Sequence, residues 1–136
     1  MHVNRLLALA ASTLLSACAS HLNAPAETVS VPDTGFRTIT GITYSPDNWP
    51  QELQADLYLP DSPDPAPAVL LVHGGGWERR SRKDMTWIAE HLAGRGFAVM
   101  NIDYRFAPEH TFPAQLHDLQ IAMNWLHARA GADNLD

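Results

Sequence analysis

The feature that most constrains this chain is a short apolar run that ends in three consecutive glycines. Residues 68–72 read Ala-Val-Leu-Leu-Val, and His73 and the glycines at 74–76 follow directly. A strand that is apolar at every position is typical of a parallel sheet with both faces covered. The glycines remove every Cβ from the following turn, so the backbone can bend sharply there. We therefore expect a buried parallel strand that opens into a tight turn.

Periodic patterns around this run predict further strands and helices in alternation. Strands are expected at residues 36–44, 53–59 and 97–103, and helices at about 82–93 and from Pro113 onward. In the strand at 53–59, apolar residues alternate with Gln54, Asp56 and Tyr58, which indicates one face in water. Strands that alternate with helices indicate an α/β fold, a mostly parallel sheet with flanking helices.

Both predicted helices carry apolar residues at spacings of three and four. The first places three such residues on one face, namely Met85, Ile88 and Leu92. The second places five there, namely Leu116, Leu119, Met123, Leu126 and Ala130. An apolar stripe of this kind normally faces the core, so we expect both stripes to pack against the sheet.

The chain is short and acidic, which limits what it can bind. Its 136 residues permit one small domain. Nine Lys and Arg stand against fifteen Asp and Glu, a net charge of −6, so no electrostatic footprint for nucleic acid exists. No apolar run reaches the roughly 18 residues of a membrane-spanning helix. A single cysteine excludes an internal disulfide and a Cys-rich zinc site, and nothing implies a metal or organic cofactor.

The N-terminus has the layout of an export signal. Arg5 precedes an apolar run, and Leu15-Ser16-Ala17-Cys18 resembles a bacterial lipobox, in which the cysteine is acylated. We expect a lipoprotein signal peptide at 1–17, a lipid-anchored tether at 18–35 and a domain at 36–136. The lipid would hold the protein on a membrane. Ala19 after the cysteine favours the outer membrane, facing the periplasm or the cell surface. The alternative is a cleaved signal peptide with an incidental Cys18.

The glycine turn is the candidate for chemistry. Backbone N–H groups that point into a cavity stabilise the oxyanion of acyl-transfer intermediates. A plain strand-to-helix turn is the structural alternative. Phosphate binding is disfavoured, because the run lacks the Gly-Lys-Ser/Thr ending of a P-loop, and Arg79 stands where Gly-x-Gly-x-x-Gly needs its last glycine.

Two motifs in sequence order resemble one enzyme family. They are His73-Gly-Gly-Gly-Trp77, after the apolar strand, and Asp103-Tyr-Arg-Phe-Ala-Pro-Glu-His110 with Phe-Pro-Ala at 112–114, after the next strand. Together they resemble the α/β-hydrolase esterases of the hormone-sensitive-lipase and feruloyl-esterase-like type. The resemblance covers residues 36–136 and implies the N-terminal half of an α/β-hydrolase fold.

The resemblance also implies roles for single residues. Gly75 and Gly76 would donate N–H groups to the oxyanion, while His73 and Gly74 would shape the turn. Trp77 would line the mouth of the substrate pocket. The first three residues of the second motif would hold the loop after the strand at 97–103 in place, and these are Asp103, Tyr104 and Arg105. The implied substrate is a small carboxylic ester.

The family's Ser-His-Asp triad has no counterpart in these residues. None of the seven serines lies in a Gly-x-Ser-x-Gly elbow, so we expect the chain to be truncated before the nucleophile elbow and inactive alone. In the family's sheet order, the strand at 68–72 would then form a bare edge that favours self-association.

Two classes of function therefore remain open. The chain is either the oxyanion-hole half of a serine esterase or lipase, or a non-catalytic truncated lipoprotein. In the latter case it is a pseudoenzyme, or a half-enzyme that needs another chain.

Overall fold

A computed structural model describes residues 33–136 of the protein. The expected signal peptide at 1–17, Cys18 and the tether as far as residue 32 lie outside the described residues. Within the described range, none of the helices has both the length and the apolar character needed to cross a membrane.

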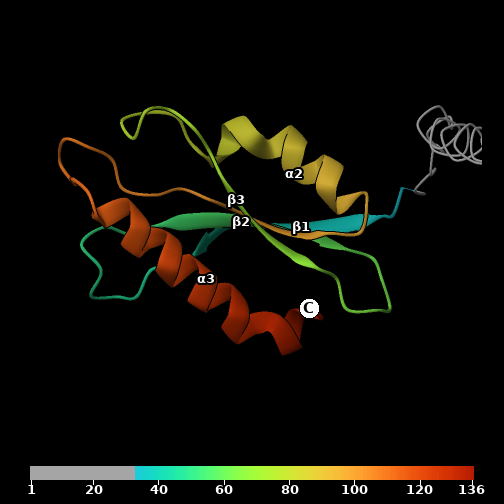
Figure 1. The fold of residues 1–136 in the computed structure, drawn as a ribbon. Helices are drawn as coiled ribbons and strands as arrows, with labels where there is room; N and C mark the ends of the chain where they lie inside the picture. Colours follow the sequence, from blue (N-terminus) through green and yellow to red (C-terminus); the bar gives the residue numbers. More distant parts are fainter. Residues whose placement is uncertain (1–32) are drawn as a thin grey trace, which may run out of the picture. The chain divides into compact units, whose positions relative to one another are not determined.

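The elements follow one another in the predicted order of strand, strand, strand, helix, strand, helix. They are β1 (Phe36–Thr43), β2 (Gln54–Pro60), β3 (Ala68–Val72), the short 3-10 helix η1 (Arg82–Met85), α2 (Thr86–Ala93), β4 (Ala98–Ile102) and α3 (Ala114–Asp133). The predicted helix at 82–93 is thus split into a 3-10 turn and an α-helix. The α/β class is confirmed (Figure 1).

The four described strands form one sheet in the order β1-β2-β4-β3. β1 pairs antiparallel with β2, β2 pairs antiparallel with β4, and β3 pairs parallel with β4. The described sheet is therefore mixed, where the sequence pattern predicted a mostly parallel one. The cause lies in the connections. Only β3 and β4 are joined through a helix, and a parallel neighbour needs such a crossover.

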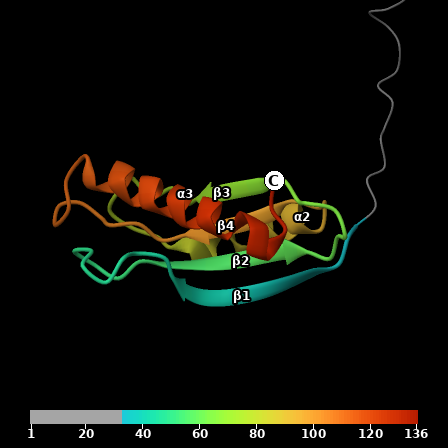
Figure 2. The ribbon, with the colours of Figure 1, turned by 90° about the horizontal axis from the view of Figure 1, so that it is seen from below.

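The two helices cover opposite faces of the sheet, as Figures 1 and 2 show. On the α3 side, Ala122 and Leu126 pack into the larger core cluster with Leu57, Met100 and Ile102. On the α2 side, the smaller cluster joins four buried residues, namely Tyr58, Ala89, Ala93 and Val99. Of the stripe predicted for the first helix, Leu92 packs against this cluster.

The prediction that one face of β2 is in water is wrong, because α2 and η1 cover that face. Tyr58 is 3% exposed and Asp56 only 5%. Arg82 lies beside Asp56, with its Nε 3.0 Å from a carboxylate oxygen, so the charge on this face is paired and not hydrated. Both faces of β2 belong to the interior.

The predicted buried stripe of α3 is also wrong in part. Leu126 is buried, but Leu116 and Met123 are 51% and 52% exposed. The helix instead buries a line that contains two polar residues, Gln115 and Asp118. Asp118 can be buried because Arg105 and Trp49 donate hydrogen bonds to its carboxylate. The side of α3 that carries Asp118 therefore faces the interior, and the predicted apolar stripe is only partly buried.

β3 lies at the edge of the described sheet, as expected. Its residues are half-buried or exposed, so the prediction that both of its faces are buried is wrong. The start of its outer edge is occupied by the C-terminal residues. Leu135 pairs parallel with Ala66, and the Asp136 N–H donates to the Ala66 carbonyl at 2.9 Å. The rest of that edge has no partner strand among residues 33–136.

Candidate active site

The glycine turn leaves the C-terminal end of β3 with a backbone that only glycine accommodates well. Gly75 has φ of 133° and Gly76 has φ of 67°. A Cβ placed on Gly75 would collide with the backbone carbonyl of Arg79. Trp77 continues the turn in the left-handed region with φ of 68°. The predicted sharp bend is therefore present, and glycine is required at Gly75 by both conformation and space.

The turn leaves its backbone donors unused. Within residues 33–136, the N–H groups of Gly75 and Gly76 have no hydrogen-bond acceptor, and the space beside the Gly76 Cα is open. Two adjacent free N–H groups at a strand end are the arrangement that an oxyanion hole needs.

Two hydrogen bonds brace the turn against the segment that follows β4. The Tyr104 hydroxyl donates to the His73 carbonyl at 3.0 Å. The Ala107 N–H donates to the Trp77 carbonyl at 2.8 Å. Both ends of the turn are thus fixed to one loop. Burial raises the pKa of Tyr104, so its hydroxyl stays protonated and can donate over a wide pH range.

His73 is part of the support beneath the turn. It is 3% exposed, and its Nδ1 lies 2.7 Å from the Gly74 carbonyl, which can only accept, so Nδ1 carries the proton. Its ring stacks on Tyr104 at 4.5 Å and meets the edge of Phe106 at 5.7 Å. Nε2 has no hydrogen-bond partner among the described residues and lies 3.9 Å from Asp103. This enclosure suits the turn-shaping role that the family resemblance implied.

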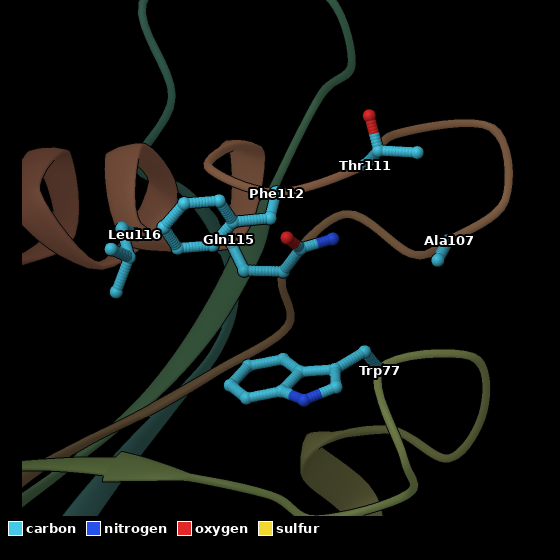
Figure 3. A pocket seen from close by; sticks show the side chains of 6 residues that line it. All are labelled: Trp77, Ala107, Thr111, Phe112, Gln115 and Leu116. Atoms are coloured by element: carbon cyan, nitrogen blue, oxygen red, sulfur yellow. The ribbon is translucent and has the colours of Figure 1, made fainter.

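Trp77 forms one wall of an apolar cavity of about 350 Å³ beside the turn. Its indole is 53% exposed and meets Tyr104 edge-on at 5.8 Å. The other walls come from the loop after β4 and from the first turn of α3 (Figure 3); their residues are Ala107, Thr111, Phe112, Gln115 and Leu116. The sequence motif indicated Trp77 but not Gln115 or Leu116, which occupy helix positions without a local signal for a pocket.

Asp103 ties the end of β4 to the start of η1. Its carboxylate accepts from the Arg82 N–H at 2.7 Å and forms an ion pair with the Arg82 guanidinium. Asn101 donates to the Arg82 carbonyl at 2.7 Å. Burial alone would lower the pKa of Arg82, but the adjacent carboxylates of Asp56 and Asp103 outweigh it and raise that pKa. Asp103 thus acts as a structural anchor behind the turn.

Arg105 anchors the next part of the same loop. Its Nε donates to Asp118 at 2.8 Å, and its backbone N–H donates to the same carboxylate at 2.9 Å. Trp49 donates its indole N–H to Asp118 at 2.8 Å, and its ring lies 5.2 Å from the Arg105 guanidinium. Arg105 and Asp118 are 6% and 0% exposed. The buried pair fixes α3 to the loop that carries Tyr104 and Ala107.

Tyr104 and Phe106 line a second, polar cavity of about 430 Å³. Glu109 and His110 line it together with Asp103 and Arg80. Among the described residues, no group of three or more His, Cys, Asp or Glu side chains is placed to hold a metal ion.

Comparisons with known proteins agree with this arrangement. A family model described as BD-FAE matches residues 55–136. Esterase LipC of Mycobacterium tuberculosis is 39% identical over 70 residues, which are 51% of this chain and 17% of that protein. Carboxylesterase NlhH of the same species is 37% identical over 68 residues, or 49% of this chain and 21% of that protein. Esterase B from Lactobacillus Rhamnosis has a TM-score of 0.67 and 26% identity, covering 98% of this chain and 41% of the other.

The family match extends over more than half of the chain, which therefore belongs to the BD-FAE family. The resemblance to α/β-hydrolase esterases is confirmed, and the described sheet and helices form part of that fold. The chain spans about a fifth of the length of these curated relatives and about two fifths of the solved esterase.

Proposed function

We propose that this chain supplies the oxyanion-binding part of a carboxylic-ester hydrolase. The observation that carries the proposal is the braced turn at residues 73–77, with two unused N–H groups at Gly75 and Gly76. The ester carbonyl oxygen would lie against these donors. The esterase names of the relatives support the same class of reaction.

The chemistry assigned to the turn is stabilisation of charge. A serine hydroxyl adds to the ester carbonyl carbon and loses its proton to a base, and the carbonyl oxygen becomes an oxyanion. That oxyanion accepts from the Gly75 and Gly76 N–H groups. Collapse of the intermediate expels the alcohol, and water then releases the acid. One oxyanion donor is worth about 3 kcal/mol of barrier in known enzymes.

We propose that the nucleophile lies outside these 136 residues, because the sequence holds no Gly-x-Ser-x-Gly elbow. The first test extends the gene through the reading frames that follow codon 136. We expect a Gly-x-Ser-x-Gly elbow followed by Asp and His. The extended protein should hydrolyse p-nitrophenyl acetate, while the 136-residue chain should not exceed a Gly75/Gly76-altered control. Turnover by the 136-residue chain, blocked by a fluorophosphonate that labels one of its serines, would contradict the proposal.

The second candidate is a non-catalytic lipoprotein that binds or assembles. The missing serine elbow is the observation in its favour. Two results would favour this candidate over the esterase. The sequence after codon 136 would be unrelated to an esterase in every frame, and the chain would show no ester hydrolysis even when an extract of its source cells is added to supply a second chain.

The proposed location is the outer membrane, through acylation of Cys18. Labelling of cells with a clickable fatty acid should mark the protein, and Cys18→Ser should abolish the label and release the protein from the membrane fraction. Equal labelling of Cys18→Ser would contradict the anchor.

A further inference from the structure

A cluster of charged side chains lies behind the glycine turn. Arg82, which is 8% exposed, pairs with two carboxylates: its Nε lies 3.0 Å from Asp56, and its guanidinium also forms an ion pair with Asp103. Across residues 33–136, neither carboxylate is paired with another Lys or Arg side chain. Two negative charges thus share one guanidinium. Excess negative charge is costly here, because the Asp56 side chain is 8% exposed and that of Asp103 26%.

His73 can supply the second cation that this cluster lacks. Its side chain is 0% exposed, and Nε2 lies 3.9 Å from a carboxylate oxygen of Asp103. In the part of the chain that the structure describes, Nε2 has no hydrogen-bond partner. In a neutral ring with the proton on Nδ1, Nε2 would be an acceptor that faces another acceptor. A proton on Nε2 removes this conflict and balances the charge of the cluster.

The contacts of the two carboxylates place that proton on His73. Asp103 accepts from the Arg82 backbone N–H at 2.7 Å in addition to its ion pair. Asp56 accepts from the Gly41 N–H at 2.8 Å. Donors and cations both favour the charged form of a carboxyl group. Both carboxylates therefore stay ionised, and the imidazole is the group that takes the proton.

The surroundings of His73 hold few other charges. Within residues 33–136, its ion-pair partner is Asp103 alone. The rings that pack against it belong to Tyr104 and Phe106, and the Tyr104 hydroxyl is protonated. The other titratable groups near Asp103 line the polar cavity, and these are Glu52, Arg80, Glu109 and His110. The first three are exposed and differ in sign, so water and mutual compensation weaken their effect on His73.

The Nδ1 side of His73 connects this charge to the proposed oxyanion site. Nδ1 lies 2.7 Å from the Gly74 carbonyl oxygen and donates to it. That carbonyl and the Gly75 N–H belong to one trans peptide unit, in which the two groups point in opposite directions. His73 therefore turns the Gly75 N–H away from its own ring. A charged donor bonds more strongly than a neutral one, so it polarises the peptide and strengthens the Gly75 N–H as a donor.

We propose that His73 is an imidazolium held by Asp103, and that it acts as a positioning residue for the Gly75 N–H. Its Nε2–H faces Asp103, while its Nδ1–H fixes the peptide unit between Gly74 and Gly75. The benefit to an oxyanion rests on the proposed function. The protonation of His73 does not, because it follows from the charges and contacts of this chain alone.

NMR of the histidine ring nitrogens tests the protonation state without a substrate. An ordinary histidine in water is largely neutral at about pH 8. In the protein carrying all 136 residues, both ring nitrogens of His73 should resonate as protonated at that pH. The exposed His117 gives the signal of a hydrated ring in the same spectrum. An unprotonated Nε2 on His73, the state in which a water bridges it to Asp103, would overturn the proposal.

Asp103→Asn tests the partner of the imidazolium. The variant keeps the size of the side chain and removes its charge, so His73 should lose the Nε2 proton at about pH 8. Asp133→Asn is the matched control, because it makes the same substitution in the ion pair with Arg129 in α3 and should leave His73 protonated. A folded Asp103→Asn protein in which His73 keeps both protons would contradict the role given to Asp103.

The unaltered protein provides a further readout that needs no variant to fold. As the pH rises above about 8, the ring nitrogens of His73 and the amide signal of Gly75 should shift with the same midpoint, since one peptide unit joins them. The Gly131 amide in α3 should not follow this transition. A Gly75 signal that stays unchanged while His73 titrates would exclude the positioning role. Failure of the esterase proposal would appear only in the hydrolysis assay, so the two failures are distinguishable.

Discussion

The Tyr104 hydroxyl donates to the His73 carbonyl at 3.0 Å, while the Tyr104 ring stacks on the His73 imidazole at 4.5 Å. One side chain thus holds both the backbone and the side chain of the residue that opens the glycine turn. The end of β4 thereby sets the orientation of a turn at the end of β3. The oxyanion geometry proposed for Gly75 and Gly76 depends on this link.

Tyr104→Phe should destabilise the protein and disturb the turn. The His73 carbonyl would lose its buried donor, which costs about 1 to 3 kcal/mol of unfolding free energy. Urea denaturation measures that loss. Tyr44→Phe is the matched control, because the Tyr44 hydroxyl donates to the Asp103 carbonyl at 2.6 Å, another hydroxyl-to-backbone bond. Both variants should lose stability, but only Tyr104→Phe should shift the amide NMR signals of residues 74–76. Identical spectral changes in the two variants would contradict the link.

Gly75→Ala should destabilise the protein by at least about 2 kcal/mol, because φ of 133° is strained for alanine and its Cβ would collide with the Arg79 carbonyl. Gly131→Ala is the control. Gly131 lies in α3 with open space around it, so alanine there should raise stability by about 0.5 to 1 kcal/mol. Thermal unfolding of the two variants should therefore move in opposite directions. A Gly75→Ala variant as stable as the parent would show that the turn has another conformation.

The glycine turn could be predicted because its cause is local. Three consecutive residues without a Cβ follow an apolar strand, and positive φ at Gly75 and Gly76 needs no distant partner. The order of strands and helices was also correct, since each element carries its own periodicity. The antiparallel pairing of β1 with β2 follows from the same pattern, because no helix lies between these strands, whereas the pairing of β2 with β4 joins strands that are not consecutive.

The buried faces were harder to predict because they depend on residues far apart in the sequence. Asp118 is fully buried only because Trp49, 69 residues earlier, and Arg105, 13 residues earlier, donate to it. Asp56 is buried because Arg82 pairs with it. Periodicity assigns such carboxylates to solvent, so it placed Leu116 and Met123 inward on α3 instead. The burial of the Gln115 amide has the same origin, since it donates to the Arg105 and His110 carbonyls in the loop after β4.

Asp118→Asn should cost about 3 to 5 kcal/mol, because it leaves the buried Arg105 guanidinium without a counter-charge. Asp133→Asn is the matched control. Arg129 and Asp133 form an i,i+4 pair in the same helix, with the Arg129 side chain 41% exposed. Loss of that pair should cost only about 0.3 to 0.5 kcal/mol. Chemical denaturation of both variants gives the comparison. Similar costs for the two substitutions would mean that the Arg105 pair is hydrated in solution.

The free energy of unfolding should fall as the pH rises above 10, the ordinary pKa of tyrosine. Burial raises the pKa of all three tyrosines, Tyr44, Tyr58 and Tyr104. The unfolded chain therefore releases these protons at lower pH than the folded chain. The stabilisation is complete below pH 10 and is lost as the pH rises toward the folded-state pKa values. Urea unfolding from about pH 9 to about pH 11 measures the slope. Tyr58→Phe should reduce it, and a flat profile over this window would contradict the raised pKa values.

Met123→Lys should weaken self-association through the outer edge of β3. Hydrogen bonds from Ala66 and Ala68 to residues 134–136 occupy only the start of that edge, and Leu70 and Met123 line an adjoining cavity of about 210 Å³. We propose that a second copy covers this half-exposed apolar strip, because an unpaired strand edge and neighbouring apolar side chains favour association. A lysine there must give up hydration, so the dissociation constant should rise by about tenfold.

Gln120→Lys is the control for this prediction, since it also introduces a lysine at an exposed position of the same helix, but at a residue that does not line this cavity. Each introduces one positive charge into a chain of net charge −6, so a general charge effect would move both variants equally. Analytical ultracentrifugation over a range of protein concentrations should show association of the parent and of Gln120→Lys, and a largely monomeric Met123→Lys. A monomeric parent at every concentration would exclude the edge as a self-association surface.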